Sequence, residues 1–132
     1  MIPDKFKELI DALIKKTKTG KADWEKVKEN NIFKLDFKES GAIILWISND
    51  DEDNLNAIVY SIKIVDKYSN EIQCIKVSDV IENDEFKMIE KLYSAIITYL
   101  WDRVNKMIDV FISSLISDRF IGKDSDPFSN FL

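Results

Sequence analysis

The side chains of this chain restrict any chemistry to carboxylates, lysines and tyrosines, because the sequence contains no histidine. Histidine is the commonest general base near neutral pH and the commonest metal ligand. Its absence excludes Ser-His-Asp and Cys-His mechanisms. The single cysteine, Cys74, excludes an intrachain disulfide and a zinc site built from cysteines. Between Gln73 and Ile75 in an expected strand, it is predicted to be a small core residue and not a nucleophile.

An enzyme or a small-ligand binder would need carboxylates gathered in a cleft of the fold. The candidates for such a cleft are Glu25, Asp36, Tyr60 and Asp66. Nothing in their spacing forms a known catalytic or metal-binding motif. We therefore predict that the protein is not an enzyme and that it binds no cofactor and no metal.

Two clusters of acidic residues are the other candidates for binding. The first, residues 50–53, lacks the turn glycine and the closing glutamate of a calcium-binding EF-hand loop. The second stands at the start of an expected helix, where the helix dipole favours negative charge; it contains Asp79, Glu82, Asp84 and Glu85. We expect solvated charges at both places. Three alternatives remain: a cation site at 50–53, an acidic loop that attracts a basic partner, and an anionic surface that imitates nucleic acid.

The charge distribution argues against nucleic-acid binding. The net charge is −5, and only two arginines, Arg103 and Arg119, are available for phosphate recognition. The N-terminal region carries a lysine stripe with Trp24 as its single interleaved aromatic residue; the stripe consists of Lys15, Lys16, Lys18, Lys21, Lys26 and Lys28. Nucleic-acid binding needs several stacking platforms or arginine forks. We expect these lysines to be solvated.

The elements that would position these residues follow from hydrophobic periodicity. An apolar stripe at helical spacing predicts a first helix over residues 4–19, ending at Gly20. Residues 23–31 are ambiguous between helix and strand. Alternating or β-branched segments predict four strands, at residues 32–38, 42–47, 57–65 and 71–77. Residues 42–47 are apolar on both faces, which suits an interior strand or a second covered face.

A long helix is predicted from about residue 84 to residue 117, with an apolar residue every three or four positions and no glycine or proline. Such a helix is about 50 Å long, more than a globule of this size needs. The fold is therefore predicted as α+β with two layers: an N-terminal helix, a four-stranded antiparallel β-meander and a long C-terminal helix. The 132 residues suggest one domain at 1–117 and a C-terminal tail at 118–132.

The second half of the long helix is the predicted partner-binding site, because its apolar arc is wider than one packing face needs. The anchors are Trp101, Met107, Ile108, Phe111, Ile112 and Leu115. In the alternative, the flanking row formed by Ile97, Trp101, Ile108 and Ile112 packs on the first helix of the same chain. The tail contains Phe128, Phe131 and Leu132, for which docking, disorder and a recognition peptide all remain open.

The segment from Leu13 to Trp24 contains a Thr/Gly turn at residues 16–21, followed by Trp24. Together with the pair Leu92-Tyr93, this pattern resembles a group of small uncharacterised bacterial proteins with an α-β-meander-α order. The resemblance covers about residues 5–100 and implies that fold order, but it implies no activity. Residues 101–132 lie outside the pattern.

We therefore expect a non-catalytic protein-interaction module that associates with itself through the C-terminal helix, as a homodimer or homo-oligomer. The alternative is an acidic inhibitor or immunity-type protein, of bacterial or phage origin, that blocks a basic site on an enzyme. Four charges within residues 95–116 argue against a membrane helix. The charged N-terminus and the lone cysteine favour a cytoplasmic location.

Overall fold

The structure is a computed structural model that describes residues 2–27, 31–50, 57–79 and 84–122. It divides into two compact units, Met1–Tyr99 and Leu100–Leu132. The boundary between the units falls within the last helix.

Helix α1 spans Asp4–Lys18 and carries its apolar residues on one side, as the spacing predicted. The carbonyl of Pro3 accepts hydrogen bonds from the backbone N–H groups of Phe6 and Lys7, both at 3.0 Å. Lysines in the last turn suit the negative end of the helix dipole. Gly20 follows at φ 73°, a left-handed conformation that ends the helix at little cost.

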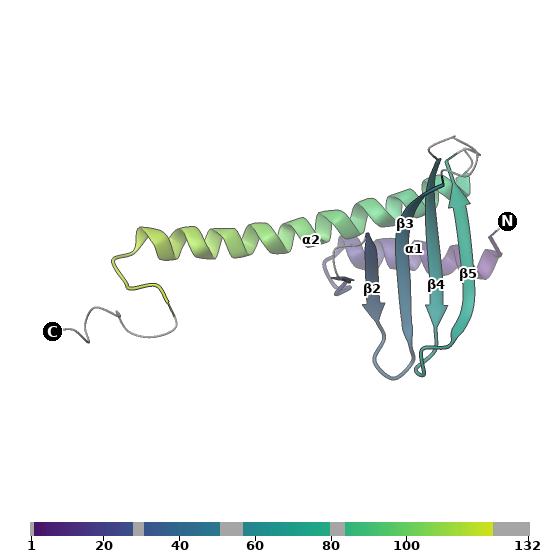
Figure 1. Ribbon diagram of the computed structural model, residues 1–132, viewed down its shortest axis with the longest axis horizontal. Helices are drawn as coiled ribbons and strands as arrows, with labels where there is room; N and C mark the ends of the chain where they lie inside the picture. Colours follow the sequence, from purple (N-terminus) through teal and green to yellow (C-terminus); the bar gives the residue numbers. More distant parts are fainter. Residues whose placement is uncertain (1, 28–30, 51–56, 80–83, 123–132) are drawn as a thin grey trace. The chain divides into compact units, whose positions relative to one another are not determined.

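The sheet is a five-stranded antiparallel meander in sequence order, and Figure 1 shows β2 to β5 side by side. Its strands are β1 (Glu25–Lys26), β2 (Ile32–Asp36), β3 (Ala42–Asp50), β4 (Ala57–Val65) and β5 (Glu71–Ser78). The predicted antiparallel meander is confirmed, but the predicted number of four strands was one too few. The additional strand, β1, has two residues and pairs Glu25 with Lys34 and Lys26 with Phe33.

Burial of Trp24 explains why the ambiguous segment forms β1. The Trp24 side chain is fully buried, and its indole N–H donates a hydrogen bond of 2.9 Å to the hydroxyl oxygen of Thr17. The Thr17 hydroxyl in turn donates to the carbonyl of Leu13 at 2.6 Å. This chain of bonds ties the segment after α1 to the core, and the next two residues meet the edge of β2.

The connection between β2 and β3 is a tight hairpin that ends β2 earlier than predicted. Lys38 has φ 59°, and the carboxylate of Asp36 accepts a hydrogen bond of 2.9 Å from its backbone N–H. Gly41 has φ 132°, and a Cβ atom there would lie 2.1 Å from the carbonyl oxygen of Val65. The turn therefore requires glycine at this position. Phe37 lies beyond the strand and is exposed, although the predicted strand at residues 32–38 included it.

The core lies between one face of the sheet and the helices. Helix α2 spans Asp84–Ile116, close to the predicted 84–117, and its first half buries Phe86, Ile89, Leu92 and Ile96. The Tyr60 ring of β4 packs 5.2 Å from the Phe86 ring and 5.6 Å from the Tyr93 ring, measured between centroids. Helix α1 lies on the same face, because its residues and Ile64 line one hollow. The predicted two-layer α+β fold is confirmed.

Among the described residues of the first unit, both helices lie on one side of the sheet (Figure 1), and we call the opposite side the open face. Alternation along the paired strands places the following side chains there, among others: Ile32, Lys34, Ile44, Trp46, Ser48, Val59, Ser61, Lys63, Cys74 and Lys76. Ile44, Trp46, Val59 and Cys74 are half-buried. An antiparallel sheet with one free face normally presents polar residues to water. This face has an apolar centre instead.

Candidate interaction surface

All six predicted anchor residues lie on α2 and are exposed. The exposed fractions of Trp101, Met107, Ile108, Phe111, Ile112 and Leu115 range from 43% to 70%. Val104, Val110 and Ile116 of the same helix are also exposed. Water therefore meets every apolar side chain that α2 carries from Trp101 to Ile116. The alternative, in which the row formed by Ile97, Trp101, Ile108 and Ile112 packs on the first helix of the same chain, stays a prediction.

Most of these side chains form one band along the helix, which we call the apolar stripe. At about 100° per residue, its members span roughly 140° of the helix circumference. The stripe consists of Trp101, Val104, Met107, Ile108, Phe111, Ile112 and Leu115. Apolar bands of about this width face the core in helices of globular proteins. The second unit thus contains an amphipathic helix whose apolar band is in water.

The size of the exposed apolar area distinguishes this surface from ordinary surface hydrophobic residues. The seven side chains of the stripe, each about half exposed, present on the order of 650 Å². The largest apolar patch on a typical monomeric protein is about 300–600 Å². A specific protein interface buries about 800 Å² on each partner. The exposed area of the stripe is therefore close to the size of one side of a protein interface.

The opposite side of the same helix segment is polar and has balanced charge. It carries Asp102, Arg103, Lys106, Asp109 and Ser113. Helices that lie on membrane surfaces normally have a polar face rich in lysine and arginine. Two acids against two bases do not give that pattern. No helix in the described part of the chain combines the length and hydropathy that a membrane span requires.

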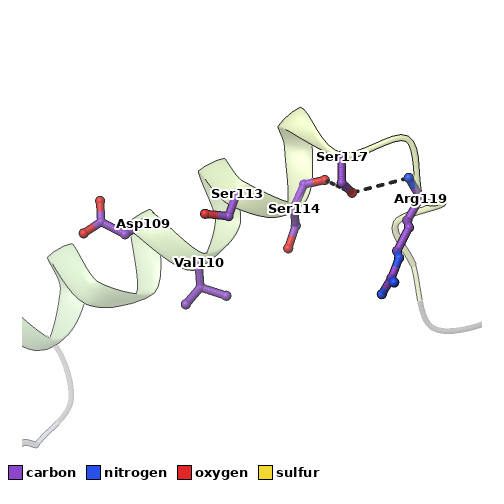
Figure 2. A pocket seen from close by; sticks show the side chains of 6 residues that line it. All are labelled: Asp109, Val110, Ser113, Ser114, Ser117 and Arg119. Atoms are coloured by element: carbon purple, nitrogen blue, oxygen red, sulfur yellow. Dashed lines mark hydrogen bonds between the residues drawn. The ribbon is translucent and has the colours of Figure 1, made fainter.

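A shallow hollow of about 450 Å³ lies beside the end of α2 (Figure 2). Its lining consists of Asp109, Val110, Ser113, Ser114, Ser117 and Arg119. The Ser117 hydroxyl donates a hydrogen bond of 3.0 Å to the carbonyl of Ser114 and accepts one of 3.3 Å from the Arg119 backbone N–H. These bonds satisfy backbone groups at the helix terminus. Every lining residue is exposed, so the hollow offers a ligand no enclosed polar group.

A second hollow, of about 510 Å³, lies in the first unit between α1 and the end of β4. Pro3, Phe6, Leu9 and Ile64 supply most of its walls, and the charged residues Lys5 and Glu8 stand at its rim. The hollow is apolar and has no convergent polar groups. Neither of these two hollows contains any of the four cleft candidates, Glu25, Asp36, Tyr60 and Asp66.

The structure gives two of the cleft candidates a structural role. Asp66 organises the β4–β5 turn, because its carboxylate accepts hydrogen bonds of 2.9 Å from the backbone N–H groups of Tyr68 and Asn70. These bonds, led by that from Asn70, lower the pKa of Asp66 below its usual value. Tyr60 is buried in the aromatic core, and burial followed by the charge of Glu90 raises the pKa of its phenol. A phenol held neutral there packs as a core residue.

Two acidic residues of the second cluster also hold backbone groups. The Asp79 carboxylate accepts a hydrogen bond of 2.9 Å from the Ile58 backbone N–H, and Glu85 accepts one from the Ile2 backbone N–H. Glu82 and residues 51–53 lie outside the described residues. Within the described residues, no group of three or more acidic or cysteine side chains could hold a metal ion.

Sequence reasoning missed the open face as a second candidate surface. Cys74, expected in the core, is half-buried at this face, in the row formed by Lys34, Ile44 and Lys63. The sequence did contain a sign of this surface, because residues 42–47 are apolar on both faces, which had suggested a second covered face. In the structure the strand is interior to the sheet, but the first unit covers one of its faces only.

Comparisons with known proteins give no family for this chain. No family model, no curated protein and no solved structure matches it. The likeness to small bacterial α-β-meander-α proteins therefore stays a prediction.

Proposed function

We propose that this protein is a non-catalytic interaction module that associates with itself through the second half of α2. The observation that carries the proposal is the apolar stripe, in which every side chain is exposed. Exposing large apolar side chains to water is unfavourable by about 25 cal/mol per Å². Association with another protein surface removes this cost.

A second copy of the chain is the simplest partner, because most soluble oligomers are closed, symmetric assemblies of one chain. Aromatic residues and methionine are enriched at the centres of such interfaces, and the stripe contains Trp101, Met107 and Phe111. The charged residues of α2 stand on the other side of the helix, where they would form the solvated rim. The lone cysteine supports a reducing compartment, and we propose the cytoplasm.

The acidic-inhibitor alternative has no comparable support. The described carboxylates of Asp79 and Glu85 are engaged with backbone N–H groups. A surface that steers a basic partner needs solvated charges facing outwards. We therefore retain self-association as the proposal.

Sedimentation of the full chain over a range of concentrations tests the proposal. We expect the wild-type protein to dimerise or form a larger symmetric oligomer, and Ile108→Asp to sediment as a monomer, because a carboxylate at the stripe would be buried unpaired. Ser113→Asp is the matched control, since it introduces the same charge on the polar side of the same helix. A wild-type chain that stays monomeric at the highest concentrations reached would overturn the proposal, as would equal effects of the two variants.

A further inference from the structure

The chain presents two apolar surfaces that no described residue of their own unit covers: the apolar stripe of α2 and the open face of the sheet. We propose that they bind each other between copies, so that the stripe of one chain packs across the open face of a second chain. The inference rests on the proposed self-association and specifies the surface that receives the helix. In a two-fold dimer each copy would give one helix and receive one, which satisfies both surfaces.

The architecture of the sheet supports this pairing. The first unit has helices on one face only, and a sheet with apolar residues on both faces is stable when both are covered. On the open face, Ile44 and Trp46 of β3 and Val59 of β4 are half-buried and form an apolar centre. The centre of this face is therefore poorly suited to contact with water.

The dimensions of the two surfaces agree. From Trp101 to Leu115 the stripe is about 21 Å long at 1.5 Å per residue. Across the strands, the sheet from β1 to β5 is about 19 Å wide at a strand spacing near 4.8 Å. A helix that runs across the strands would cover the open face from edge to edge. Helix α1 already runs across the strands on the other face (Figure 1).

Charges near the two surfaces have matching spacing. Lys34 and Lys63 lie in one row of the open face, two strands apart, and are therefore about 9.6 Å from each other. Asp102 and Asp109 lie on the flank of the polar side that is nearest to Ile112 of the stripe, seven residues and about 10.5 Å apart along the helix. Lys34 has no ion-pair partner within the described residues, while Lys63 has only a long contact of 3.7 Å with Glu71. Lysine side chains are long enough to reach such a flank.

This placement predicts which residue approaches the native cysteine. Cys74 is the next position after Lys63 in the same row, one strand further. If Asp102 lies near Lys34 and Asp109 lies near Lys63, the helix reaches Cys74 one strand, or about 4.8 Å, further on. At 1.5 Å per residue, the residue that lies near Cys74 is about three positions after Asp109. That position is Ile112, which belongs to the stripe and is exposed. The neighbouring Ser113 points to the polar side and serves as the matched control.

Disulfide trapping in the full-length chain tests the inference. We expect Ile112→Cys to form an interchain disulfide between Cys74 and the introduced thiol on mild oxidation, located by peptide mapping, and Ser113→Cys to form it several-fold more slowly. The combination of Ile112→Cys with Cys74→Ser should lose the cross-link. As a second measurement, Lys34→Glu should weaken dimerisation about fivefold, and adding Asp102→Lys should restore it.

The possible results separate the two proposals. Cross-links only between two introduced thiols would show helix-to-helix pairing, which overturns this inference and leaves self-association standing. A disulfide within one chain, seen as a monomer on a non-reducing gel, would overturn it as well. A monomer in sedimentation and no interchain cross-link in any variant would overturn both.

Discussion

Truncation of Phe111 measures how much the apolar stripe contributes to association. The Phe111 side chain is 56% exposed, which for a ring side chain of about 200 Å² corresponds to about 110 Å² of apolar area. Burying this area contributes about 2.8 kcal/mol at 25 cal/mol per Å². Alanine retains part of the contact, so Phe111→Ala should lose about 2 kcal/mol per protomer. A two-fold dimer contains the site twice, and the loss of about 4 kcal/mol raises the dimer dissociation constant roughly 10³-fold.

The same substitution should leave the stability of the isolated chain almost unchanged. Phe111 is exposed, and alanine is a better helix former than phenylalanine. Sedimentation equilibrium gives the dissociation constant, and thermal unfolding at a concentration where the wild type is monomeric gives the stability. Ser113→Ala is the control and should change neither quantity. A dissociation constant within threefold or so of the wild type refutes the reasoning, since about 0.7 kcal/mol is far below the expected loss. A large fall in the melting temperature of the monomer also refutes it, because Phe111 would then pack within its own chain.

Three further predictions concern the first unit. Ile89→Ala should destabilise the fold by about 2–5 kcal/mol in denaturant unfolding, because Ile89 is fully buried between α2 and the sheet; a cost below about 0.5 kcal/mol would contradict this core. Gly41→Ala should lower the melting temperature by several degrees, since the added Cβ would meet the Val65 carbonyl oxygen and φ is 132°. Gly20→Ala is the control: its Cβ meets no atom within 4 Å, so it tests the effect of a positive φ alone. The pKa of Asp66 is lowered in the folded state, so its stabilising effect is present above the unfolded value of 3.8 and is lost as the pH falls through the folded value. Asp66→Asn should therefore show a smaller loss of stability than the wild type on acidification through this range, and an unshifted Asp66 titration in NMR would contradict the assignment.

The sequence predicted the elements with strong periodicity and failed where a segment was too short to have one. The helices and the strands at residues 57–65 and 71–77 were placed within two residues, because a stripe or an alternation runs through each of them. Strand β1 has two residues, so period-two alternation cannot be recognised there. Its position is decided by the burial of Trp24 and the bond to Thr17, which are long-range effects. Phe37 was misplaced because the hairpin, with positive φ at Lys38, ends β2 one residue before it.

The sequence predicted the residues of the apolar stripe on α2, but it did not predict the open face of the sheet. Repetition every three or four residues identified the apolar residues of α2, which the structure shows to be exposed from Trp101 onwards, while their role as anchors stays a proposal. The open face could not be identified in this way. Apolar residues on both sides of residues 42–47 are compatible with helices on either or both faces of a sheet, and only the placement of α1 and α2 decides which face stays free.

The three tryptophans of the first and second units stand in three different surroundings: Trp24 is fully enclosed, Trp46 is half-buried on the sheet, and Trp101 is exposed on α2. Indole emission shifts to shorter wavelengths when water leaves the ring, so each residue would give a separate optical signal in a variant that keeps only that tryptophan. Trp24 would report unfolding of the first unit, while Trp46 and Trp101 would respond to dilution. A concentration-dependent shift at both of the latter, with none at Trp24, is the spectral signature expected when two chains meet without any change in their interiors.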